Sequence, residues 1–184
     1  MAARLRLALG VCLILACASA AHAQIGVYAM ASGGFLGQLT SPSGAQESNS
    51  FAVFGGTFGV YDQFVKVGPV RFGADGRFFV ESGNNGGAGN KLHGGLGGLR
   101  LAFQSGLVPV KPYIQAEVGG ASTNEGNAQT NKTAFAYQVE GGLDFTLLPH
   151  LDARAEYGGG QVEGVQTGTS QTLQEVGFGL VVRF

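Results

Sequence analysis

The last twelve residues of the chain, 173–184, alternate large apolar side chains with polar or small ones. On one face the pattern places Val176, Phe178, Leu180, Val182 and Phe184. On the other face it places Glu175, Gly177, Gly179 and Arg183. Because successive side chains of a strand point to opposite faces, this segment is predicted to be a β-strand whose two faces meet different media.

The first 23 residues have the pattern of a secretory signal peptide. Two arginines precede an apolar run over residues 7–18, and an Ala-x-Ala site lies directly before Gln24. The run is too short for a membrane-spanning helix, which needs about 20 apolar residues. The residues before Cys17 resemble a lipoprotein cleavage box only loosely, so cleavage before Gln24 is the preferred prediction. We therefore expect a signal peptide over residues 1–23 and one domain over residues 24–184.

Composition excludes several classes of function for this domain. Both cysteines lie in residues 1–23, so the rest of the chain has no disulfide, thiol nucleophile or cysteine-bound metal. Its nine basic and 12 acidic residues give a net charge of −3, which argues against nucleic-acid binding. It has no run of 18 apolar residues, so membrane insertion would have to use strands. Glycine accounts for 33 of 184 residues without a triplet period, as expected where the wall of a small barrel bends sharply.

The periodicity predicts eight strands, joined alternately by long and short connections. The strands are expected at residues 25–36, 51–62, 66–81, 92–104, 111–122, 134–147, 151–162 and 173–184. Long polar connections are expected at residues 37–50, 82–91, 123–133 and 163–172. Shorter ones are expected at residues 63–65, 105–110 and 148–150. This alternation is typical of outer-membrane barrels, which have long outer loops and short periplasmic turns.

Charged side chains share one face of the predicted strands, and apolar side chains share the other. A soluble barrel would bury the apolar face, whereas a membrane barrel would turn it toward lipid and enclose the charges. The five arginines after residue 23 all lie within strands, and the four lysines lie at joints or strand ends. Because the planar guanidinium satisfies several acceptors in a closed interior, this distribution favours the membrane barrel.

We therefore predict a lumen charge network that braces the wall. Its members are Arg71, Asp75, Arg77, Glu81, Arg100, Glu117, Glu140, Asp144, Asp152, Arg154, Glu156, Glu175 and Arg183. Eight strands leave a lumen that side chains just fill, so bracing is preferred to a narrow path for cations. On the lipid side, an interfacial aromatic girdle would have to use phenylalanine and tyrosine, since the chain has no tryptophan, and Tyr61, Tyr137 and Tyr157 are its candidates.

Catalytic and metal-binding patterns are weak. The glycine-rich residues 94–99 lack the following helix and lysine of a phosphate-binding loop. His93 and His150 are expected at opposite ends of the barrel, so they cannot form a joint metal site. His93 with a distant hydroxyl, Ser82 or Ser122, is the one candidate for a lipid-modifying site, and no local pattern supports it. We expect no enzymatic activity, no cofactor and no metal.

The chain resembles the OmpA/OmpX-type, porin-like outer-membrane β-barrel family across residues 24–184. The resemblance is carried by residues 111–120, 141–145, 151–157 and 178–184. It implies an all-β, eight-stranded, antiparallel up-and-down transmembrane barrel in the outer membrane of a Gram-negative-type envelope. It also implies contact with outer-membrane lipid and lipopolysaccharide, and insertion by the Bam machinery. The implied assembly signal is Phe178, Leu180, Val182 and Phe184.

The function expected from these features is structural or surface-interactive, with an extracellular partner bound through the four long loops. Three alternatives stay open at this point. The first is a narrow porin-like diffusion pore, the second a soluble periplasmic lipocalin-like binder, and the third a lipid-modifying outer-membrane enzyme.

Overall fold

The computed structural model describes residues 24–40, 46–47, 51–85, 88–105, 108–124, 133–163 and 170–184. The predicted signal peptide lies outside these residues. The strands are β1 (Gln24–Thr40), β2 (Gln46–Glu47), β3 (Phe51–Val67), β4 (Val70–Asn85), β5 (Ala88–Phe103), β6 (Val110–Asn124), β7 (Thr133–Leu148), β8 (Leu151–Glu163) and β9 (Ser170–Arg183). None of the described residues forms a helix long and apolar enough to cross a bilayer.

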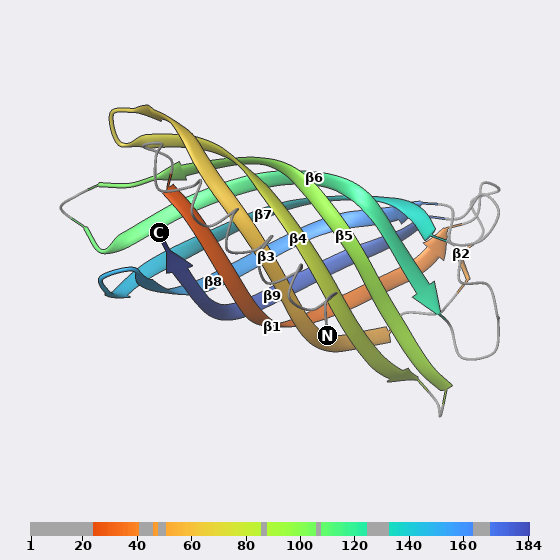
Figure 1. Cartoon of the computed structure of the whole chain (residues 1–184). Coiled ribbons are helices and arrows are strands. Elements are labelled where there is room, and N and C mark those ends of the chain that lie inside the picture. The colour runs from red at the N-terminus through yellow and green to blue at the C-terminus, as the bar shows by residue number, and fades with distance from the viewer. Residues whose placement is uncertain are drawn as a thin grey trace, which may run out of the picture.

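The long strands form a closed antiparallel barrel in which each pairs with its neighbours in sequence (Figure 1). The barrel closes between β1 and β9, with a register that runs from Gly26 opposite Arg183 to Leu36 opposite Leu173. The two-residue β2 was not predicted, and it pairs with the end of β1 at Leu39 and Thr40. The predicted eight-stranded up-and-down barrel is therefore confirmed.

The strands run further at the loop end than the sequence predicts. β4 continues to Asn85 and β5 begins at Ala88, so the expected loop 82–91 is mostly a paired hairpin. β1 likewise extends into the expected loop 37–50. The loops expected at 123–133 and 163–172 are shortened at their ends in the same way. Backbone pairing continues through these glycine-, serine- and asparagine-rich residues because the ladder depends on main-chain groups rather than side-chain polarity.

One short connection was predicted in the wrong place. Residues 63–65 belong to β3, and the turn lies at Gly68 and Pro69. The register between β3 and β4 shifts between Asp62 and Val65, so an extra residue is accommodated as a bulge. Gly68 has a φ of 59°, a conformation that glycine adopts without steric cost. A bulge breaks the period of two, which is why the pattern indicated a strand end there.

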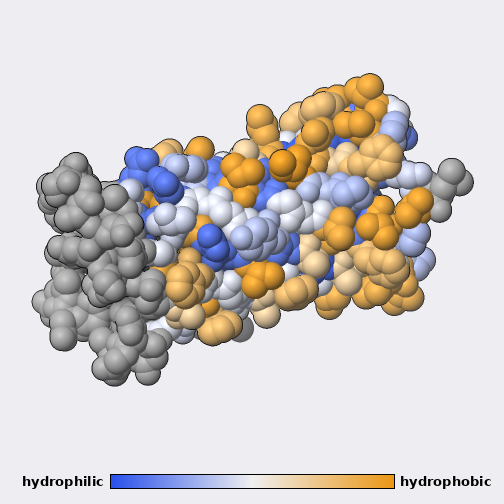
Figure 2. All heavy atoms as spheres, turned by 180° about the vertical axis from the view of Figure 1, so that it is seen from behind, coloured by the Kyte–Doolittle hydropathy of each residue, from blue (hydrophilic) through white to orange (hydrophobic). Residues whose placement is uncertain are grey.

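Side chains separate by polarity across the wall. Outward residues of the C-terminal strand such as Phe178, Leu180 and Val182 are exposed, whereas Arg154 on β8 is only 2% exposed. Figure 2 shows apolar side chains on the outer wall, most densely over the right half of the view. A soluble lipid-binding barrel needs the reverse arrangement, with its apolar face inward. The outer surface is thus suited to acyl chains rather than water.

Candidate functional site: the filled lumen

Charged side chains fill the middle of the barrel, and Arg77 is their hub. Its Nε lies 2.9 Å from Glu117, and its Nη1 contacts both Glu140 and Glu156. Its Nη2 also donates to Glu156 at 3.1 Å, and Asp75 lies 3.9 Å from its Nε. One guanidinium on β4 thereby ties β6, β7 and β8 together across the lumen. The planar fork of arginine makes such a multiple contact possible.

A second cluster joins two further arginines through one carboxylate. Arg154 donates from Nε and Nη2 to Asp144 at 2.7 and 2.9 Å. Arg100 donates to the same Asp144 at 2.9 Å and to Gln115 at 2.9 Å. Arg100 and Arg154 are both 2% exposed, so these charges interact with little screening by water.

Three tyrosine rings close the space around these arginines. The Arg100 guanidinium lies 3.5 Å from the ring centroid of Tyr113 and 4.4 Å from that of Tyr61. The Arg154 guanidinium lies 4.3 Å from the centroid of Tyr28. Cation–π contacts of this kind strengthen when they are desolvated. Tyr61 is therefore a lumen residue, and its predicted place in an outer aromatic girdle is wrong.

Each of these rings packs against a glycine of the neighbouring strand. Tyr28 lies opposite Gly59 and Tyr61 opposite Gly26 in the β1–β3 register. Tyr113 lies opposite Gly142 between β6 and β7 in the same manner. A glycine lets the ring lie flat on the wall, where any side chain would displace it. These positions account for part of the high glycine content.

The short-turn end of the lumen holds a smaller ion cluster. Asp152 binds Lys111 at 2.9 Å and Arg183 at 2.7 Å. Lys111 was missed in the sequence, although it shares its strand face with Tyr113, a signal that could have identified it. Arg71 was predicted to belong to the network, but its Nη1 donates to the carbonyl of Gly68 in the adjacent turn at 3.1 Å. Arg71 therefore lies outside the network. Glu81 and Glu175 form a separate group, and the other predicted members lie in the ion clusters described above.

An apolar layer closes the lumen toward the long loops. It includes Leu36, Val53, Leu92, Val162 and Leu173, each at most 3% exposed. These residues lie near the loop-side ends of their strands and point inward. The sequence analysis missed this layer because it assigned apolar side chains to the lipid face. Together with the arginines and tyrosines below it, the layer gives the described strands an interior of buried side chains.

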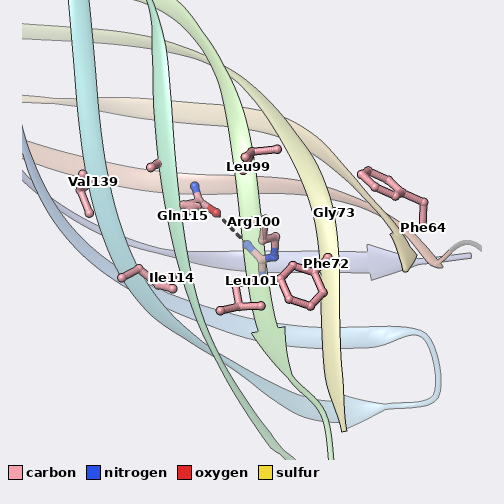
Figure 3. Close-up of a pocket in the computed structure, with 10 residues that line it drawn as sticks. Phe64, Phe72, Gly73, Leu99, Arg100, Leu101, Ile114, Gln115 and Val139 are labelled. Carbon is pink, nitrogen blue, oxygen red and sulfur yellow. Dashed lines mark hydrogen bonds between the residues drawn. The ribbon is translucent and has the colours of Figure 1, made fainter. Parts of the chain in front are cut away.

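On the outer wall, a shallow apolar groove lies across β4, β5 and β6, with one residue each from β3 and β7 at its edges (Figure 3). Its volume is about 440 Å³, and Phe64 and Phe72 line one side. Leu99, Ile114 and Val139 line the rest, while the hydrogen-bonded Arg100 and Gln115 come from the strands that form its floor. A groove of this lining can take an acyl chain of the surrounding lipid.

The candidate catalytic residues lie at the rim without forming a site. His93 pairs with Ser122 in the β5–β6 register, closer than the sequence suggested. Within the described strands, the His93 side chain forms no hydrogen bond with Ser122 or Ser82. His150 lies at the other end, in the turn between β7 and β8, with its Nδ1 3.0 Å from the carbonyl of Arg183. The described part of the chain contains no group of three His, Cys, Asp or Glu side chains arranged to hold a metal.

No protein-family model and no curated protein sequence matches the chain. Several solved structures do. Neisserial surface protein A is 19% identical with a TM-score of 0.57, over 86% of this chain and 97% of that one. Ail, the attachment invasion locus protein of Yersinia pestis, is 14% identical with a TM-score of 0.55, over 88% and 98%. The outer-membrane enzyme PagL is 12% identical with a TM-score of 0.51, over 86% and 98%.

The chain therefore has the fold of the eight-stranded outer-membrane β-barrels. At these identities the likeness is one of fold alone. The three similar proteins are named as a surface protein, an attachment protein and an enzyme, so the fold does not determine the activity.

Proposed function

We propose that this protein is a non-enzymatic outer-membrane barrel of a Gram-negative-type envelope, which presents its long loops at the cell surface. The observation that carries the proposal is a lumen filled by ion clusters, tyrosines and an apolar layer inside an apolar outer wall. A filled lumen favours a wall that supports loops over a pore. The names of two structural neighbours, a surface protein and an attachment protein, agree with a surface role.

The proposed partners follow from this placement. The outer wall would contact outer-membrane lipid and lipopolysaccharide, with the groove between Phe72 and Leu99 holding one acyl chain. Loop residues within 37–50, 82–91, 123–133 and 163–172 would contact an extracellular partner. Their central parts lie outside the described residues, so the proposal rests on where the strands lead. The proposed export signal, residues 1–23, agrees with this location.

A filled lumen predicts that the purified barrel does not conduct ions. We expect no stable conductance steps when it is reconstituted in planar lipid bilayers, because the charges at Arg77, Arg100 and Arg154 are engaged and Leu36 and Leu173 close the loop end. An open porin inserted in the same bilayers is the positive control. Stable steps from the folded protein would contradict the surface-wall proposal and favour the narrow pore.

The proposed Bam signal predicts an effect on assembly that is separate from stability. Phe184 is 61% exposed, and its main-chain N–H donates to the carbonyl of Ile25 at 2.9 Å. Phe184→Ala keeps that hydrogen bond, so refolding of purified protein into detergent should be unchanged. In cells, the heat-modifiable folded form in outer-membrane fractions should fall several-fold. The control is Phe54→Ala, which removes a phenylalanine of β3 that is also well exposed, at 70%. Equal losses for both variants would remove the special role of Phe184.

A further inference from the structure

Two carboxylates lie in the lumen apart from the arginine clusters. Glu81 and Glu175 are 1% and 5% exposed. They are linked by two hydroxyl groups in one chain of contacts. Ser32 Oγ lies 2.7 Å from Glu81, Thr57 Oγ1 lies 3.2 Å from Ser32, and Thr57 Oγ1 lies 3.1 Å from Glu175. This chain of hydrogen bonds therefore spans β4, β1, β3 and β9.

This chain contains three oxygen–oxygen contacts, but its two hydroxyl groups supply only two protons. Thr57 has a single hydroxyl proton and faces two acceptors, Ser32 and Glu175. If both carboxyls were ionised, one of the three contacts would bring lone pairs together without a proton between them. A proton on either carboxyl completes the chain. Donation then runs from Glu81 through Ser32 and Thr57 to Glu175, or in the reverse direction.

The surrounding charges support the same conclusion. Among the described residues, no arginine or lysine forms an ion pair with Glu81 or Glu175. Arg77, the hub of the neighbouring cluster, is engaged by acids of β6, β7 and β8. From β7, Gln138 donates to Glu175 at 3.0 Å, and the Glu140 carboxyl interacts electrostatically with Glu175. Two unpaired buried carboxylates would repel each other with little screening, which a shared proton relieves.

Two further atoms of this group lack a partner. Glu81 Oε2 and Gln138 Oε1 are buried without a hydrogen bond, and both residues are 1% exposed. Both atoms are acceptors, so the group as a whole is short of protons rather than short of acceptors. Acceptors without a partner also occur beside Arg77, at Asp75 and Glu117, but the arginine clusters contain N–H groups without an acceptor as well, at Arg100 Nε and Arg154 Nη1.

We propose that Glu81, Ser32, Thr57 and Glu175 form a buried proton-binding site, in which one proton is shared by the two carboxyls. When the direction of donation along these hydrogen bonds reverses, the O–H bond of Glu81 breaks as Ser32 takes that proton. Ser32 passes its own proton to Thr57, and Thr57 passes its own to Glu175. One negative charge moves across the lumen, and no proton is gained or lost.

The direct test is infrared spectroscopy of the purified barrel in detergent at neutral pH. The wild type is expected to show the C=O band of a protonated carboxyl that shifts in D₂O. E81Q and E175Q should each lose the intensity of one carboxyl, because the amide supplies the missing donor and the remaining acid ionises. The double variant should lose no more than either single variant. The proposal would be overturned if the double variant lost the band intensity of two protonated carboxyls, or if neither single variant lost any.

Urea unfolding gives an independent test with a matched control in the same lumen. E81Q should leave the unfolding midpoint unchanged, since an amide N–H₂ replaces a carboxyl O–H toward Ser32. E156Q should lower the midpoint, because Glu156 accepts two hydrogen bonds from Arg77 as an ionised group. If E81Q does not fold, E175Q makes the same test from the other end. If E81Q lowers the unfolding midpoint, and if EDTA also lowers the midpoint of the wild type, the site holds a bound cation in place of the proton.

Discussion

Replacing Arg77 with methionine is expected to lower the free energy of unfolding by about 3–5 kcal/mol, the usual cost of removing one partner from a buried ion cluster. The substitution keeps the length of the side chain but leaves Glu117, Glu140 and Glu156 without their common cation. All three acids are buried, so water cannot replace the lost contacts without opening the lumen. No other single side chain among the described residues joins as many strands through charge.

The measurement is urea unfolding in detergent micelles, followed by the heat-modifiable shift in electrophoretic mobility. Arg71→Met is the matched control, because Arg71 donates to the Gly68 carbonyl at the turn and forms no ion pair among the described residues. We expect the control to change stability by less than about 0.5 kcal/mol, as surface substitutions do. Arg77→Lys should be intermediate, since lysine restores the charge without the fork. Equal effects at positions 71 and 77 would contradict the role of Arg77 as hub.

Strand number and orientation were predictable because they depend on local alternation. The odd and even positions of Leu151–Glu163, for example, differ in polarity over most of the strand, and the structure separates them across the wall. Tyr61 and Lys111 follow the same alternation. Tyr61 was nevertheless predicted for the outer girdle because it is a tyrosine, and Lys111 was left out of the lumen network because it is a lysine at a strand end. Following the alternation through each strand places both in the lumen.

The pairing of charges inside the lumen was not predictable. Glu81 and Glu117 look alike in sequence, each on the polar face of a strand, yet Glu117 contacts Arg77 and Glu81 contacts Ser32. Which side chains meet depends on the stagger of strands around the closed barrel, and the sequence does not state that stagger. The bulge after Asp62 shifts the register further. The inward apolar layer was not predicted for a related reason. The alternation separates two faces of each strand, but it does not show at which height the lumen changes from charged to apolar side chains.

The contacts between tyrosines and glycines lead to the second large effect. Gly59→Ala would place a Cβ 2.3 Å from the ring of Tyr28, far inside van der Waals contact. The ring cannot easily move away, because its hydroxyl donates to Asp75 at 2.7 Å and its face covers Arg154. Overpacking of this kind costs about 1–3 kcal/mol. We expect Gly59→Ala to lower the free energy of unfolding by that amount, at the upper end if the contact with Arg154 is lost as well.

The control for this prediction is Gly76→Ala on the lipid side of β4, where an added Cβ has no neighbour within 4 Å. Because alanine there meets only acyl chains or detergent, stability should stay the same or rise slightly, since replacing glycine restricts the unfolded chain. Both variants are compared with the wild type by urea unfolding, and near-ultraviolet circular dichroism reports the packing of the tyrosines. A loss of tyrosine signal in Gly59→Ala alone identifies the ring as the group displaced. If both variants unfold at the wild-type urea concentration, the tyrosine is free to move and the lumen is less tightly packed than its contacts indicate.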